Sequence, residues 1–269
     1  MIPANSSIPV SISGLDLSLP GSYELTAVVQ NLSATDPVAA NDTIRKMVRQ
    51  LQNDPVDPNS GFIETFEATG TGSLSADSMG ITADERWDFF NSTDTGRLRF
   101  LVSPEITISG DRSVSMDAWM PTPDNQNYLD GTFNLAGRDI LTEELRLEFD
   151  YKLHGKPRFS GGNQVWARGG DEDSWVPVFT YDTLRDAGEI IGSGSLSLTD
   201  ALLQRGQSLS ASFQLRFGQH DTSVIAANSY GNGLTLDNIR LYTVVNDVQL
   251  LGIAAPSAVG CALGSSESL

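Results

Sequence analysis

Apolar and polar residues alternate along much of the chain between residues 62 and 242. The alternation is unbroken over 145–153, where odd positions are apolar and even positions are polar, and it recurs over 210–217. A strand with one face in a core and the other in water requires this period of two. Similar short segments, separated by Gly, Asn, Asp and Ser, lie at 98–102, 113–119, 164–167, 175–181, 209–217 and 234–242. The pattern predicts an all-β fold, an antiparallel jelly roll or β-sandwich.

One short helix is predicted at 196–205, with Thr199 or Asp200 as its N-cap and Gly206 as its stop. At the start of the chain, the segments 7–12 and 23–29 alternate as strands do. Two strands are not stable alone in water, so we expect this region to be the end of a separate sandwich. The apolar residues near 44–51 fit either a short helix or a departing strand, and the chain alternates again over 246–253.

Both ends of the chain resemble one family. The segment 21–29 (GSYELTAVV) is similar to the last strands of CARDB-type immunoglobulin-like repeats, and 246–264 is similar to the opening of such a repeat. The centre is similar to MAM-like and carbohydrate-module-like jelly rolls, at GFIETFE (61–67) and GLTLDNIRL (233–241). The resemblance implies that 1–50 ends one immunoglobulin-like repeat, 51–60 is a linker, 61–244 is the jelly roll, and 245–269 begins another repeat. It also implies a large secreted bacterial surface protein or adhesin.

The charge restricts the partners that we expect. Lys and Arg number 17 against 34 Asp and Glu, a formal net charge of −17, which argues against nucleic acid and anionic membranes because both attract clustered cations. Apolar runs stay short of 18 residues, so membrane insertion is not expected. The start of the chain lacks a signal peptide, and we interpret the sequence as an excerpt of an extracellular, cell-surface protein. Neighbouring repeats, copies of the same protein, and surface glycans or proteins are the expected partners.

The resemblance also suggests a calcium site. In the similar jelly rolls, an acidic residue after the first-strand Phe can meet an Asp near the start of the last strand. Those positions are Glu67 and Asp237 here, with Glu64 and Asn238 close to them in sequence. Carboxylate and amide oxygens are the ligands that Ca²⁺ prefers, so a structural Ca²⁺ is the one cofactor expected. The alternative is that these side chains cap turns or face solvent.

Exposed aromatic side chains would be needed for glycan binding. The candidates are Trp87, Trp119, Trp166 and Trp175, together with Tyr128. Each could instead pack in the core or across a strand pair, because periodicity does not show which face of a sheet is wet.

Catalytic motifs are absent from the sequence. It has no G-x-S-x-G elbow, phosphate-binding loop or CxxC pair, so we expect no enzyme and no catalytic residues. The main hypothesis is a structural or adhesive segment of an extracellular bacterial protein or filament. The alternative is a carbohydrate-binding module or an accessory domain of a secreted hydrolase, because a fold alone does not select a function.

Overall fold

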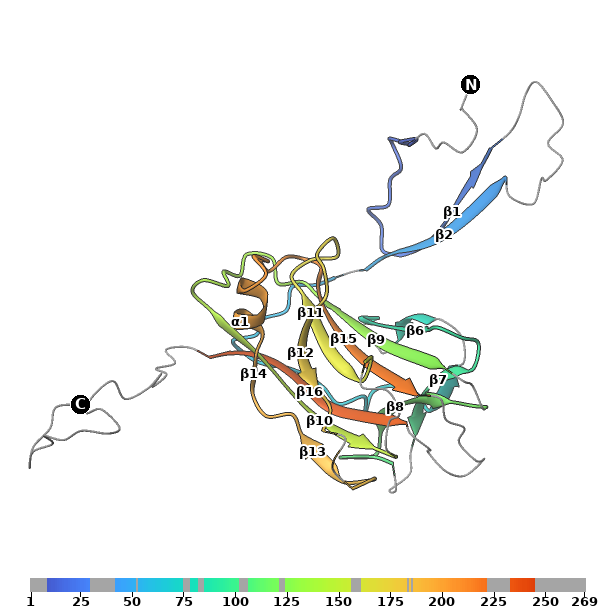
Figure 1. Ribbon diagram of the computed structural model, residues 1–269. Coiled ribbons are helices and arrows are strands. Elements are labelled where there is room, and N and C mark those ends of the chain that lie inside the picture. The colour runs from blue at the N-terminus through green and yellow to red at the C-terminus, as the bar shows by residue number, and fades with distance from the viewer. Residues whose placement is uncertain are drawn as a thin grey trace, which may run out of the picture.

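Two antiparallel β-sheets lie face to face as a jelly-roll sandwich, and a two-stranded ribbon stands apart from them (Figure 1). This arrangement confirms the predicted all-β sandwich. The structure is a computed structural model, and it describes residues 9–29, 42–51, 53–74, 78–81, 85–101, 106–120, 124–155, 161–182, 184, 186–221 and 233–244.

The first sheet, called the β9 sheet, carries the candidate site. Its strand order is β12 (Val176–Thr180), β11 (Gln164–Arg168), β15 (Phe213–Asp221), β9 (Asn125–Phe133), β6 (Trp87–Asn91) and β5 (Ser78–Ile81). On β15, Phe213, Leu215 and Phe217 are buried. The intervening residues Gln214 and Arg216 therefore point to the outer face, because successive side chains of a strand alternate. The predicted strand at 209–217 thus begins four residues late and continues to Asp221.

The second sheet, called the β10 sheet, covers the other side of the core. Its strand order is β13 (Ile190–Gly192), β10 (Glu144–Leu153), β16 (Leu234–Val244), β8 (Ser113–Ala118), β7 (Gly96–Leu101) and β4 (Gly72–Leu74), with β14 (Leu196–Ser197) beside β10 and β3 (Phe62–Glu64) beside β16. The alternation over 145–153 is reproduced in β10, where Leu145, Leu147 and Phe149 are buried. A register shift between Glu148 and Asp150 interrupts its pairing with β16.

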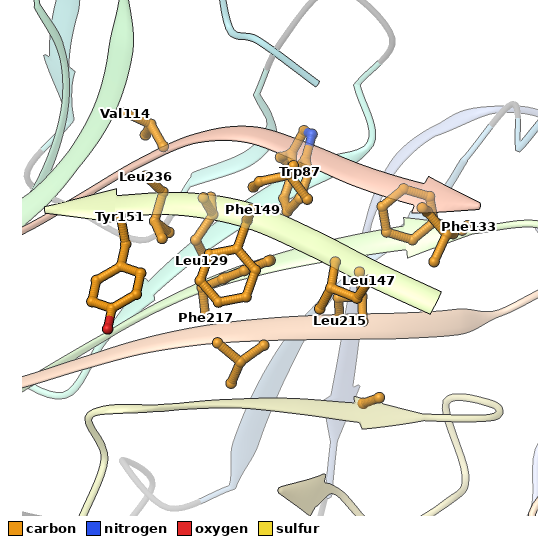
Figure 2. Close-up of a cluster of buried hydrophobic side chains, with 14 of the residues drawn as sticks. Trp87, Val114, Leu129, Phe133, Leu147, Phe149, Tyr151, Leu215, Phe217 and Leu236 are labelled. Atoms are coloured by element: carbon orange, nitrogen blue, oxygen red, sulfur yellow. The ribbon is translucent and has the colours of Figure 1, made fainter. Parts of the chain in front are cut away.

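Aromatic side chains fill the space between the sheets (Figure 2). The rings of Trp87 and Phe133 are 5.9 Å apart and almost perpendicular, as are those of Phe149 and Phe217 at 5.2 Å. Edge-to-face contacts of this kind suit the ring quadrupoles. Gly131 is required beside Trp87, because a Cβ at this position would lie 2.7 Å from Trp87 Cζ3.

The predicted helix is present but shorter than expected. It is α1 (Leu198–Leu203), and its N-cap is Ser197, whose side chain accepts a hydrogen bond from the Asp200 amide at 3.1 Å. The prediction of Thr199 or Asp200 as the cap is wrong. The Thr199 hydroxyl instead joins the helix to the start of β10, by donating to the Glu143 carbonyl and accepting from the Leu145 amide.

The ribbon pairs β1 (Gly21–Val28) with β2 (Thr43–Gln50). The region near 44–51 is therefore a strand and not a helix. Residues 9–12 of the strand predicted at 7–12 are not strand, and Val10 and Ile12 are 83% and 70% exposed. The alternating residues do not form a strand here because the described residues supply no neighbouring strand to pair with them. The repeat predicted to begin at 245–269 lies outside the described residues.

The predicted linker is held against the sandwich. The Val56 amide donates to the Asn134 carbonyl at 3.0 Å, and the Thr243 amide donates to the Pro58 carbonyl at 3.1 Å. Residues 53–60 thus connect the last strand of the ribbon to the C-terminal ends of β9 and β16, one strand of each sheet.

Candidate functional site

The outer face of the β9 sheet carries three large aromatic side chains that are only partly buried. They are Tyr128 on β9, Trp166 on β11, and Trp175 just before β12. We call these three residues the aromatic platform. The rings of Tyr128 and Trp166 meet edge to face, with centroids 6.2 Å apart.

A glycine allows Trp166 to lie close over the sheet. A Cβ at Gly218 on β15 would be 2.6 Å from Trp166 Cζ3 and 2.4 Å from the Gly162 carbonyl oxygen. Any larger residue at 218 would therefore displace the indole or the backbone. Local sequence gives no sign of this requirement, because the two residues come from different strands.

Two arginines hold the platform from beside it. The Arg216 guanidinium lies 4.7 Å from the Tyr128 ring centroid and 4.2 Å from that of Trp175. Arg168 lies 4.5 Å from the same Trp175 ring. Cation–π contacts of this kind fix the orientation of the rings that take part in them.

A buried carboxylate fixes Arg216 in turn. Asp130 is 5% exposed, and it accepts hydrogen bonds from Arg216 Nε at 2.8 Å and Nη2 at 2.6 Å. Burial raises the pKa of Asp130, and the hydrogen bonds and charge of Arg216 oppose that rise. The pair is bidentate, the geometry in which an Arg is most strongly oriented by a carboxylate.

Arg168 is held by neutral groups and backbone. Its Nε donates to Gln214 Oε1 at 2.7 Å, and its Nη1 donates to the Asp171 carbonyl at 2.6 Å. Gln214 Nε2 donates in turn to Thr132 Oγ1 at 3.0 Å. Both arginines that contact the platform are therefore hydrogen-bonded to protein groups.

The four tryptophans predicted to stack on a ligand lie in three different parts of the structure. Trp166 and Trp175 lie on the aromatic platform. Trp119 is 48% exposed but follows β8 in the other sheet, where its indole N–H donates to the Asp94 carbonyl at 3.1 Å. Trp87 is 0% exposed and lies between the sheets (Figure 2), so its prediction as a ligand-stacking residue is corrected: it is a core residue. The Trp87 side chain points inward because the register of β6 on β9 places Trp87 opposite Gly131.

The first pair of predicted calcium ligands is occupied by protein donors. Glu67 Oε1 accepts the backbone amides of Asp111 at 2.9 Å and Arg112 at 3.0 Å. Glu64 Oε2 accepts the indole N–H of Trp87 at 3.2 Å. These N–H groups occupy lone pairs of the carboxylate oxygens that a metal ion would otherwise use.

The second pair is occupied similarly. Asp237 Oδ2 accepts the Ser109 amide at 3.1 Å, the Ser109 hydroxyl at 3.0 Å and the Ser113 hydroxyl at 2.8 Å. Its Oδ1 accepts the Asn238 amide at 2.8 Å, and Asn238 Nδ2 donates to Asp150 Oδ2 at the same distance. Burial raises the pKa of Asp237, and these hydrogen bonds oppose the rise.

These four residues, as they are placed, do not fit one calcium shell. Within the described part of the chain, no group of three or more acidic, His or Cys side chains is arranged to hold a metal ion. The expected link between the first and last strands is made instead by N–H and O–H donors of residues 109–113. Calcium binding by this protein stays a prediction.

Comparisons with known proteins show a partial likeness of fold. No family model matches the chain, and no curated protein matches it; the MAM-like and CARDB-type resemblances stay predictions. The chain is similar to a solved structure of TmCBM61 in complex with beta-1,4-galactotriose, with 10% identity, a TM-score of 0.36, and coverage of 58% of this chain and 87% of that chain.

Two further solved structures are similar to the same extent. One is the family 11 carbohydrate-binding module of a cellulosomal cellulase of Clostridium thermocellum, with 12% identity, a TM-score of 0.36, and coverage of 68% of this chain and 100% of that chain. The other is an ENZbleach xylanase mutant, with 13% identity, a TM-score of 0.38, and coverage of 76% and 99%. These values transfer no ligand or activity to this chain. No helix among the described residues has the length and apolar character needed to span a bilayer.

Proposed function

We propose that this protein binds a neutral polysaccharide, without catalysis, on the outer face of the β9 sheet. The observation that carries the proposal is the aromatic platform: Tyr128, Trp166 and Trp175 are only partly buried on the outer face of the β9 sheet, and Arg216 contacts the rings of Tyr128 and Trp175. The C–H faces of sugar rings are apolar and stack on aromatic rings, and their hydroxyl groups need polar partners at the ring edges.

The surroundings of the platform support a sugar ligand over an apolar one. Gln214 and Thr132 lie beside it, and Gln126 and Gln164 occupy outward positions on β9 and β11. Amide and hydroxyl groups both donate and accept, as sugar hydroxyls do. Gln126 accepts from the Tyr128 hydroxyl and Gln164 donates to the Thr180 hydroxyl at 3.2 Å, and each amide has more donor and acceptor sites than that one bond uses.

The charge distribution supports a neutral ligand. Arg216 is paired with Asp130, and Arg168 donates to Gln214 and to backbone carbonyls. A polyanion would find these cations already engaged and would approach a chain with a net charge of −17. We therefore expect xylan, β-1,4-glucan or β-1,4-galactan to bind in preference to polygalacturonate.

Affinity gel electrophoresis and calorimetry with these four polysaccharides test the proposal. Trp166→Ala and Trp175→Ala should each weaken binding about tenfold or more, the loss typical of a large aromatic anchor. Trp119→Ala is the matched control, because it removes an exposed indole from the other sheet and should leave the affinity unchanged. Equal losses in all three variants, or unaltered binding in the two platform variants, would contradict the proposal.

The ribbon supports a second proposal, that the chain is a structural or adhesive segment of an extracellular assembly. Val28 and Ile44 are 56% and 71% exposed on β1 and β2, and an isolated two-stranded ribbon is marginally stable in water. Additional strands from neighbouring repeats or copies of the chain would cover these side chains. Light scattering over a range of concentrations tests association between copies, and an unchanged monomer mass would argue against it.

A further inference from the structure

A cleft lies between the end of the ribbon and the outer face of the β9 sheet. Its volume is about 330 Å³. Met47, Arg49 and Asn53 contribute to one wall, and Phe90, Thr132 and Gln214 contribute to the sheet side. The cleft thus joins residues of β2 and the segment after it to residues of β6, β9 and β15.

The wall of the cleft that the end of the ribbon forms is anchored to the sandwich at two points. Arg49, whose side chain is 7% exposed, forms an ion pair with Asp88 and donates to the Glu85 carbonyl. Asp88 Oδ1 also accepts the Gly80 amide at 2.9 Å. This buried pair connects β2 directly to β6, so the wall stands at a defined position over the sheet.

Asn53 provides the second anchor. Its Nδ2 donates to the Ala211 carbonyl at 2.7 Å, and its carbonyl accepts from Asn134 Nδ2 at 2.9 Å. Its backbone is left-handed, with φ of 53°, a conformation that Asn tolerates better than most residues. Asn53 Oδ1 is buried and has no hydrogen-bond partner among the described residues, and Asn53 is one of the residues that line the cleft.

The lining has the mixed character of a sugar site. Thr132, Gln214 and Asn53 offer neutral polar groups, while Met47 and Phe90 offer apolar surface. The charges of Arg49 and Asp88 are paired with each other, and the Asp171 carboxylate, which also lines the cleft, accepts from the Ser212 hydroxyl at 2.9 Å. A neutral ligand with both C–H faces and hydroxyl groups suits this lining better than an ion or a purely apolar molecule.

The cleft lies beside the aromatic platform on the same face of the sheet. Phe90 on β6 is the cross-strand partner of Tyr128 on β9, and Gln214 donates to Thr132 while accepting from Arg168. The platform strand β11 and the cleft strand β6 are separated by β15 and β9. Three strand spacings amount to about 14 Å across the sheet, a distance that an oligosaccharide spans and a monosaccharide does not.

We propose that this cleft is a second subsite for the same neutral polysaccharide, and that the end of the ribbon is therefore part of the binding site. This inference rests on the proposed function of the aromatic platform. A glycan chain that stacks on Trp166 and Tyr128 would continue across β9 and place further sugar units under Met47 and Asn53. The ribbon then has a recognition role besides any structural one.

Calorimetry with trisaccharides and hexasaccharides of whichever polysaccharide binds tests the inference. Met47→Ala and Asn53→Gly each remove cleft surface, and glycine retains the left-handed backbone at 53. Each variant should weaken hexasaccharide binding about tenfold and leave trisaccharide binding within about twofold. Ile44→Ala is the control, since Ile44 is 71% exposed on the same strand and does not line the cleft.

The outcomes separate the two proposals. If Trp175→Ala weakens both ligands and the cleft variants weaken neither, the platform binds glycan and the cleft inference is wrong. If the cleft variants weaken the trisaccharide as strongly as the hexasaccharide, the cleft is not a separate subsite. If the unaltered protein binds neither ligand, the proposed function fails and this inference falls with it. Circular dichroism melting of each variant confirms that it has folded.

Discussion

Replacing Arg216 by methionine tests whether a buried ion pair holds the aromatic platform in place. Methionine keeps much of the aliphatic length but removes the guanidinium, and this leaves the Asp130 carboxylate, 5% exposed, without its charged partner. Breaking a buried pair from one side costs about 3–5 kcal/mol. The Arg216 side chain is 25% exposed, so water can reach part of the site, and we expect the lower figure of about 3 kcal/mol.

Urea and thermal unfolding followed by circular dichroism measure this loss. For a domain of this size, each kcal/mol changes the melting temperature by about 2–4 °C, so the variant should melt about 6–12 °C lower. The same variant should lose glycan affinity, because Tyr128 and Trp175 both rest on the Arg216 guanidinium.

A second substitution and a change of pH identify the cause. Asp130→Asn in the Arg216→Met background removes the stranded charge and should restore most of the stability. Without Arg216, burial should raise the pKa of Asp130 further above its unfolded value. The folded state would then bind a proton more tightly than the unfolded state, so lowering the pH from 7 towards 4 should stabilise Arg216→Met relative to the unaltered protein.

The reasoning would be refuted by either of two results. One is a loss below about 0.5 kcal/mol in Arg216→Met, the range of an ordinary surface change. The other is an Asp130→Asn rescue that restores none of the loss, because the damage would then come from packing and not from an unpaired carboxylate.

Two further predictions concern the platform and the opposite sheet. Gly218→Ala should push Trp166 or the backbone aside, cost about 1–3 kcal/mol and reduce glycan affinity; Gly192→Ala is the control, since its Cβ would meet only a side-chain oxygen at 3.5 Å, and equal effects of the two would contradict the crowding argument. Burial, with the nearby charge of Lys152, lowers the pKa of His154 to about 4. The unfolded state therefore binds more protons between pH 6.5 and 4, and up to roughly 3 kcal/mol of stability should be lost as the pH falls through this window. His154→Asn should show a flatter pH profile in urea unfolding, and an unchanged profile would exclude His154 as the source.

The alternation pattern predicts the buried face of some strands correctly, and other strands carry no such pattern. The segments 145–153 and 210–217 alternate without interruption, and their predicted inward residues are correct over 145–153 and over 213–217, whereas Ala211 is exposed and precedes the strand. The strand β9 has no such signal, because Asn125 and Asn127 point inward and are buried. Asn127 is satisfied there by the Asp117 carbonyl and by Gln219 Oε1, partners that lie on other strands. A polar inward position hides the period of two.

The candidate site was predicted only in part for a related reason. The sequence predicts Trp166 and Trp175 as stacking residues, but it predicts the buried Trp87 as one on the same grounds. All three lie on or beside strands, and the difference between core and surface depends on which face of the sheet meets the second sheet. Periodicity within one strand contains no information about that packing.

The sequence by itself determined the fold class, the net negative charge and the short list of aromatic candidates, because alternation, net charge and residue type are local or additive properties. The tertiary structure alone decided which aromatics are exposed, that Asp130 meets Arg216 across 86 residues of chain, and that the end of β2 meets β6 beside a cleft. These depend on strand order and register, which bring distant residues to one face. The free energy that selects a register is summed over the whole sheet, so no single segment contains it.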